Sequence, residues 1–81
     1  MSGKVIKSFA SPGVIGEGLA FDGKYLWHCD RGTDLIYQID LNGKVIKSFP
    51  SPAGDPTGLA FDGKYLWHCD QASNLIYQIA V

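Results

Sequence analysis

The sequence predicts an all-β protein built from two copies of one four-stranded unit. Residues 3–41 align with residues 43–81 at an offset of 40, and 27 of these 39 positions are identical without a gap. Repeats of about this length occur in both all-β and all-helical repeat proteins, so the periodicity inside the unit decides the class. Short β-type runs separated by Gly-containing turns indicate strands.

The first copy divides into strands in a regular order. Two-residue hairpin turns are signalled at Asp22-Gly23 and at Asn42-Gly43, because both positions of such a turn need positive φ. The first run, at residues 4–9, is named the outer strand, and it is followed by a loop that contains Pro and Gly. Strands are expected at residues 4–9, 18–21, 25–29, 35–39 and 44–49, after which the same order repeats.

Both faces of these strands are apolar. Side chains alternate along a strand, so Trp27 and Cys29 point to one side and Leu26 and His28 to the other. Each sheet therefore needs cover on two sides, as a blade of a β-propeller receives from its two neighbours. The small residues of strand 18–21 suit the crowded centre of such a ring. A two-sheet sandwich within one chain is the alternative, but it would expose two apolar outer faces.

The second copy resembles a blade of the NHL-like, six-bladed β-propellers. The resemblance rests on PTGLAFDG, YLWHCD and LIY, which begin at residues 56, 65 and 75. They follow the family's order of Pro-x-Gly-apolar-Ala-apolar-Asp, then apolar-aromatic-apolar-small-Asp, then an Asn before the third strand. The resemblance covers essentially the whole chain and implies a propeller with blade repeats at 1–42 and 43–81, but no particular activity. The first copy departs from the pattern at Gly16, where Pro56 stands in the second, and both copies have His where the family has an apolar residue.

The order of the strands leaves an open edge at each end of the chain. The last sheet lacks its outer strand, while the outer strand 4–9 has no third strand before it. A neighbouring chain can supply both missing partners by head-to-tail pairing, which must close into a ring or grow as a fibre. We expect strand 4–9 to be donated to a neighbour and three chains to form a six-bladed homotrimer, with an eight-bladed tetramer as the second choice.

The amino-acid composition argues against nucleic acid and membranes as partners. The chain has seven basic and eight acidic residues and no basic cluster, so we expect no binding to nucleic acid. No apolar run approaches membrane-spanning length, and residues 1–4 lead directly into repeat sequence without room for a signal peptide. We therefore expect a cytoplasmic protein whose partner is itself, with no membrane association.

Loops at one end of the predicted sheets, named the upper face, carry most of the variation between the copies. Ten of the 12 differing positions fall there. One explanation is that loops vary freely because they carry little packing. The other is that the upper face binds a small molecule or peptide at the mouth of the central channel. The candidate ligand-binding residues are Glu17, Asp30, Arg31, Asp34, Asp55, Thr57, Asp70, Gln71 and Asn74.

Two kinds of side chain have both a structural and a functional interpretation. Asp30 and Asp70 end a strand, where a short carboxylate usually accepts backbone hydrogen bonds in its own turn, although a carboxylate ring could instead hold a cation. His28 and Cys29 are adjacent, as are His68 and Cys69, and adjacent strand residues point to opposite faces, so they cannot ligate one ion together. A His/Cys pair with a lowered thiol pKa would need His28 from one blade and Cys69 from the next. We favour ordinary packing and expect neither metal nor cofactor.

The sequence favours a non-enzymatic, self-assembling scaffold or binding module, of a kind that records the duplication of one blade. It contains no Ser-His-Asp order, nucleotide-binding glycine pattern or metal-ligand cluster. The alternative function is that of a propeller hydrolase or lyase with its site on the upper face around the channel. An engineered origin also stays open. Convergence of ionisable loop groups around one cleft would distinguish the enzyme from the scaffold.

Overall fold

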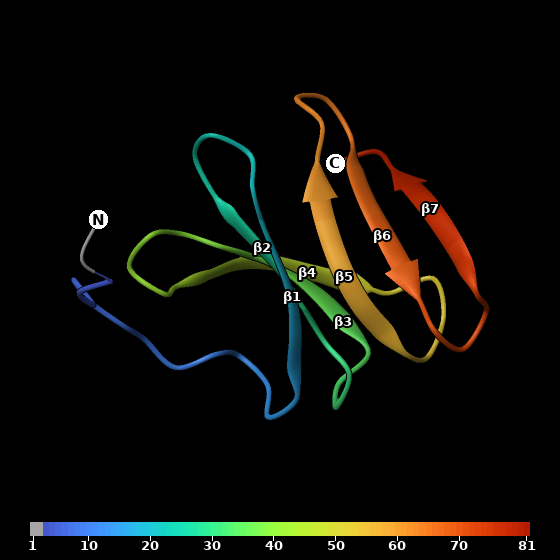
Figure 1. Cartoon of the computed structure of the whole chain (residues 1–81), viewed down its shortest axis with the longest axis horizontal. Coiled ribbons are helices and arrows are strands. Elements are labelled where there is room, and N and C mark those ends of the chain that lie inside the picture. The colour runs from blue at the N-terminus through green and yellow to red at the C-terminus, as the bar shows by residue number, and fades with distance from the viewer. Residues whose placement is uncertain (1–2) are drawn as a thin grey trace.

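The computed structural model describes residues 3–81 as two antiparallel β-sheets and no helix. The first sheet has the strand order β1-β2-β3-β4 and the second has the order β5-β6-β7 (Figure 1). The strands are β1 (Gly16–Phe21), β2 (Leu26–Asp30), β3 (Leu35–Ile39), β4 (Val45–Pro50), β5 (Pro56–Phe61), β6 (Leu66–Asp70) and β7 (Leu75–Ile79). The predicted all-β class is confirmed. Among the described residues, no helix is present that could cross a membrane.

Seven of the eight expected strands are present. β3 begins and ends as predicted, whereas β1 starts two residues earlier because its pairing with β2 continues past a β-bulge at Glu17. The same bulge occurs at Thr57 in β5. Residues 4–9 belong to no strand of this chain, and they have the same sequence, KVIKSF, as residues 44–49, which supply most of β4. The second sheet accordingly stops at β7.

The turn after β1 is closed by the carboxylate of Asp22. Its Oδ1 accepts hydrogen bonds from the backbone N–H groups of Lys24 and Tyr25 at 2.8 and 2.7 Å, and its Oδ2 accepts one from Trp27 Nε1 at 2.8 Å. Asp62 closes the equivalent turn after β5 with the same three contacts. Burial raises the pKa of Asp22, but these hydrogen bonds outweigh it, and the pKa lies below its ordinary value of 3.8.

Each sheet has two faces, which are named after the adjacent cysteine and histidine of β2 and β6. The cysteine face carries Gly18, Ala20, Trp27, Cys29 and Ile36 in the first sheet and Gly58, Ala60, Trp67, Cys69 and Ile76 in the second. The histidine face carries Leu19, Leu26, His28, Tyr37 and Ile39 in the first sheet and Leu59, Leu66, His68, Tyr77 and Ile79 in the second. The two sheets thus present the same residue types on corresponding faces.

The cysteine face of the first sheet packs on the histidine face of the second. Trp27, Cys29 and Ile36 from the former and Leu66 from the latter form the buried core, and His68 beside them is only 1% exposed. Further residues of the second sheet that pack against this core are Leu59, Phe61 and Ile79. The contact is therefore between unlike faces of two like sheets.

The two sheets are closest at β1 and β5. Within residues 3–81, the only strands of different sheets that contact each other through the backbone are β1 with β5 and β2 with β5. A Cβ atom on Gly18 would lie 3.0 Å from Gly58 Cα and 2.9 Å from Cys29 Sγ, so this approach requires glycine. The strands β4 and β7, at the far edges of the two sheets, make no such close approach to the other sheet.

Candidate functional site

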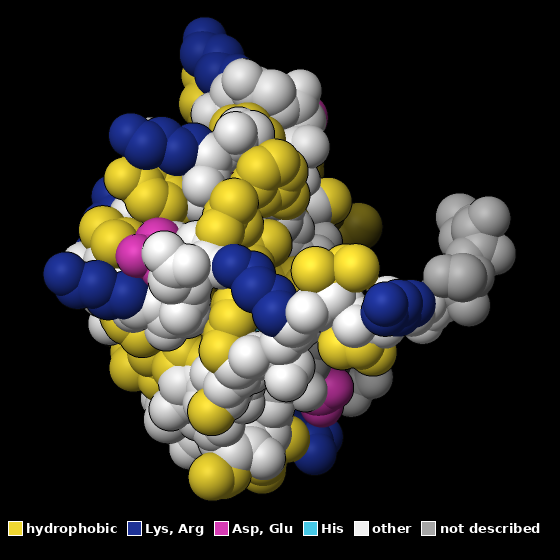
Figure 2. Space-filling model, turned by 90° about the vertical axis from the view of Figure 1, so that its left-hand side faces the viewer, with side chains coloured by type: hydrophobic (Ala, Val, Ile, Leu, Met, Phe, Trp, Pro, Cys, Tyr) yellow, Lys and Arg dark blue, Asp and Glu magenta, His cyan; other side chains and the backbone are white. Residues whose placement is uncertain are grey.

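Two apolar sheet faces of the chain have no sheet packed on them, the histidine face of the first sheet and the cysteine face of the second. Ile76 is 74% exposed, whereas its counterpart Ile36 is fully buried, and Cys69 is exposed whereas Cys29 is buried. On the histidine face of the first sheet, Leu19 is 62% exposed, whereas Tyr37 and Ile39 are buried and the N-terminal segment lies against part of this face. Both faces are called uncovered because no other sheet packs on them. Figure 2 views the molecule from the side of the N-terminal segment and shows hydrophobic side chains gathered across it between lysines and arginine. These two faces are the candidate interaction surfaces of the described chain.

Each uncovered face is hollowed. On the histidine face of the first sheet, a cavity of about 190 Å³ lies between Leu19, Leu26, Ile39 and Phe9 of the N-terminal segment. On the cysteine face of the second sheet, a cavity of about 260 Å³ is lined by residues that include Gly58, Ala60, Trp67, Cys69 and Ile76. Both hollows lie where the covered faces receive side chains of the other sheet.

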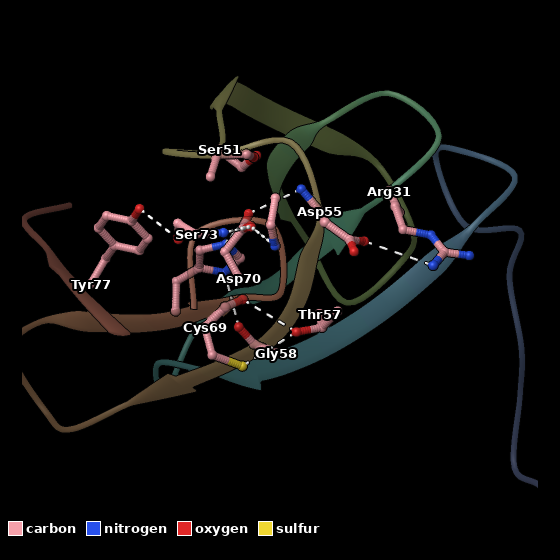
Figure 3. Close-up of polar contacts among 12 residues, drawn as sticks. Arg31, Ser51, Asp55, Thr57, Gly58, Cys69, Asp70, Ser73 and Tyr77 are labelled. Carbon is pink, nitrogen blue, oxygen red and sulfur yellow. Dashed lines mark hydrogen bonds and ion pairs between the residues drawn. The ribbon is translucent and has the colours of Figure 1, made fainter. Parts of the chain in front are cut away.

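The upper-face loops bring together three of the predicted ligand-binding residues. Arg31 Nε lies 3.7 Å from Glu17 Oε1, and Arg31 Nη1 lies 3.7 Å from Asp55 Oδ1, across the junction of the two sheets. Figure 3 shows Arg31 reaching over to Asp55. Pairs this long and this exposed contribute about 0–1 kcal/mol each. Asp55 Oδ1 is buried and accepts no hydrogen bond from the described residues, so this cluster retains an open acceptor.

Asp30 and Asp70 are buried and bind their own loops. Asp30 Oδ2 accepts a hydrogen bond from Ile15 N and its Oδ1 accepts one from Thr33 N, both at 3.0 Å. Asp70 accepts hydrogen bonds in the same way from Asp55 N at 3.1 Å and from the backbone N–H groups of the turn that follows it. The carboxylates therefore join the loop before each first strand to the loop after each second strand. Residues 3–81 contain no group of three or more side chains suited to hold a metal ion.

The remaining upper-face candidates have backbone or local roles. Asp34 and Asn74 have φ values of 57° and 56°, a conformation that Asp and Asn tolerate better than other side chains. Gln71 donates its backbone N–H to Asp55 O at 3.1 Å. Thr57 occupies the bulge of β5, and its Oγ1 makes only long contacts to Cys69, at 3.4 and 3.5 Å (Figure 3).

The histidines and cysteines lie on opposite faces, as the alternation of strand residues requires. Nδ1 of His28 donates to Gly18 O, and Nδ1 of His68 donates to Gly58 O, both at 2.9 Å. Nε2 of each ring is buried without a hydrogen-bond partner among the described residues. His68 Nε2 lies 3.9 Å from Asp70 Oδ2, beyond hydrogen-bond distance. The imidazole of His28 thus links β2 to the bulged strand β1, and that of His68 links β6 to the bulged strand β5.

The two thiols differ in their environment. Burial raises the pKa of Cys29 to about 11 from 9.0, whereas Cys69 is exposed on the uncovered cysteine face. At neutral pH, a rise of two pKa units lowers the thiolate fraction by about 100-fold. In dilute, unassociated chains we expect a disulfide reagent to modify Cys69 at least about 100-fold faster than Cys29. Mass spectrometry of digested, labelled protein measures both rates, and equal rates would contradict the buried position of Cys29.

Sequence reasoning missed two features of the site. The bulges that position Glu17 and Thr57 gave no sequence signal beyond the glycine that follows each of them. Lys24, Lys47 and Lys64, at the opposite end, were not among the predicted site residues, although they line a cleft between the two sheets. Identical lysines at equivalent positions in both copies were the available signal.

No protein-family model matches this chain, and a search of curated proteins finds no match either. The function proposed below therefore rests on the geometry of the two uncovered faces and on the internal repeat.

Proposed function

We propose that this chain is a self-assembling scaffold whose copies join head to tail into a closed β-propeller. The observation that carries the proposal is the packing of unlike faces inside the chain. The cysteine face of the first sheet binds the histidine face of the second, and each sheet has a second face of the opposite type left uncovered. One further copy on each side, placed by the same geometry, would cover both of these faces.

Support comes first from the identity of the residues involved. The covered cysteine face and the uncovered one have the same side chains, and so do the two histidine faces. A contact that is stable within the chain is therefore available, residue for residue, between chains. Forming this contact between chains would bury Ile76 and Cys69, just as Ile36 and Cys29 are buried within the single chain.

Support comes second from the N-terminal segment. β4 pairs with β3, with Phe49 opposite Ile36 and Val45 opposite Ile39. Residues 4–9 repeat residues 44–49, and β7 repeats β3, so residues 4–9 of one copy fit the open edge of β7 in another. In this chain, Phe9 already lines the cavity on the histidine face of the first sheet. Phe49 has the equivalent position beside the second sheet, because it packs against the core that includes Leu66 of that sheet's histidine face.

Support comes third from the loop hydrogen bonds, several of which recur at equivalent positions in the two copies. Ser11 Oγ donates to Gly13 O as Ser51 Oγ donates to Ala53 O. Ser51 also donates its backbone N–H to Asp34 O at 2.9 Å, which joins its loop to the end of the preceding strand. The equivalent acceptor for Ser11 is the carbonyl oxygen of Asn74, and in the proposed ring a second copy supplies it.

We take the ring to be a trimer with six blades, because the NHL-like propellers that the repeat resembles mostly have six. A tetramer with eight blades is the alternative. Three copies of the Arg31 cluster with Glu17 and Asp55 would then stand around one end of the channel, where a small molecule or peptide could bind. No arrangement of the described ionisable groups favours catalysis, so a scaffold or binding role is the function we propose.

Native mass spectrometry tests the assembly directly. We expect a species of about 26 kDa, three times the 8.8 kDa of one chain, whereas a tetramer would give about 35 kDa. A folded, unassociated chain at micromolar concentration would refute the proposal.

The variant Gly58→Ala separates assembly from folding. A Cβ atom on Gly58 meets only Cys69 Sγ within the chain, at 2.8 Å, and that side chain is exposed and able to turn away. In the ring the same Cβ would meet the backbone of a second copy, as one on Gly18 would meet Gly58 here. We expect G58A to stay folded and to lose the oligomer, while G54A, at a position with open space, keeps it.

A further inference from the structure

The cleft lined by Lys24, Lys47 and Lys64 lies between the two sheets, at the end opposite the upper-face loops. Its volume is about 350 Å³. Figure 1 shows the turn from β1 to β2 and the turn from β5 to β6 at this same end of the molecule. The side chains that give the cleft its chemistry are Tyr25, Trp27, Phe61, Lys24, Lys47 and Lys64.

The cleft has an excess of positive charge. Its three lysines come from three different elements, the two turns and β4, and none of them has a carboxylate within ion-pair distance among residues 3–81. Asp22 also lines the cleft, but its oxygens accept hydrogen bonds from backbone N–H groups and from Trp27 Nε1. Val81 also lines the cleft, and in this 81-residue chain it carries the terminal carboxylate. Three lysines therefore face two carboxylates, of which that of Asp22 is already bound in its turn.

Aromatic rings adjoin these ammonium groups. Lys47 Nζ lies 5.8 Å from the ring centroid of Trp27, and Lys24 Nζ lies 5.2 Å from that of Tyr25. Such contacts hold a lysine head beside an apolar surface. The cleft therefore offers cationic groups and rings side by side, and its volume is at the lower end of those found for small-molecule sites.

We propose that this cleft binds a phosphate monoester attached to an aromatic body. Lysine acts as a point charge that suits phosphate, and a monoester carries about −1.5 to −2 charges at neutral pH, so it would be attracted by all three lysines of the cleft. Inorganic phosphate alone would leave the aromatic wall unused. The cleft is formed within one chain, so the inference does not depend on ring assembly.

Titration of the full chain with phenyl phosphate, followed by calorimetry and by the indole N–H resonance of Trp27, tests the site. We expect saturable binding that is at least about fivefold tighter than that of inorganic phosphate or of phenol, and that weakens as salt is added. Equal affinity for phenyl phosphate and inorganic phosphate, or no saturable binding, would overturn the proposal.

The variant Lys47→Gln has a matched control in the same hairpin. Lys47 is exposed on β4, and its replacement removes one of the three cleft charges together with its cation–π contact to Trp27. We expect K47Q to weaken phenyl phosphate binding about fivefold and Lys44→Gln, which lies outside the cleft, to leave it unchanged. An equal loss in both variants would mean that general surface charge attracts the probe, and the cleft would not be its site.

The number of phenyl phosphate molecules bound per chain distinguishes the proposed cleft from the proposed assembly. In the proposed ring, Lys7, Lys24 and Lys64 would build an identical cleft at each junction between chains. Two bound molecules per chain would support both proposals, and one per chain would support the cleft alone. A ring of the expected mass that binds no phenyl phosphate would refute the cleft and leave the assembly standing.

Discussion

Deleting residues 1–9 should convert the proposed oligomer into single folded chains. The deletion removes the only segment whose sequence matches β4 and that could complete the sheet ending at β7. It leaves the seven strands and the core around Trp27 and Leu66 intact. We therefore expect circular dichroism to retain its β signature, while light scattering reports the mass of one shortened chain and no 26 kDa species.

Two controls make the deletion informative. Removing residues 1–2 alone should leave the oligomer unchanged, since the outer strand begins at Lys4. The double variant Lys7→Pro/Ser8→Pro keeps nearly the whole chain but removes two adjacent backbone N–H groups, at least one of which would face β7. It should behave as the deletion does. An oligomer that survives both changes would show that strand donation is not what holds the copies together.

Gly18→Ala should lower the stability of the chain itself. The added methyl group would lie 3.0 Å from both Gly58 Cα and Leu59 N, and backbone atoms cannot turn aside as a flexible side chain can. β1 and β5 would have to separate, and this would loosen the contact between the two sheets. We expect a loss of about 1–3 kcal/mol in the free energy of unfolding, measured as a lower urea midpoint at fixed protein concentration.

The comparison with Gly54→Ala removes the general effect of replacing glycine. A Cβ atom on Gly54 meets nothing within 4 Å and its φ is not positive, so G54A should change the unfolding free energy by no more than about 0.5 kcal/mol. If G18A unfolds at the same urea concentration as G54A, the two sheets do not pack through Gly18 and Gly58. G18A and G58A also form a pair, because the first tests the junction inside the chain and the second tests the proposed junction between chains.

Much of the fold could be read from the sequence because its signals are local. The Asp22-Gly23 turn, the alternation around Trp27 and Cys29, and the limits of β3 follow from backbone preferences of a few adjacent residues. The structural role of Asp30 was equally local, since its partners include Thr33 in its own turn. The position of Arg31 between Glu17 and Asp55 was not predictable, because it depends on a bulge in β1 and on how the second sheet sits beside the first.

The sequence by itself determined that two like sheets form and that each has two apolar faces, because side-chain alternation and turn residues act within one strand or hairpin. Only the tertiary structure decided which faces meet. The cysteine face of the first sheet packs on the histidine face of the second because Gly18 and Gly58 let β1 and β5 approach, and both faces carry the same residues in either copy. That choice leaves one face of each kind uncovered, a result of packing geometry that no single strand encodes.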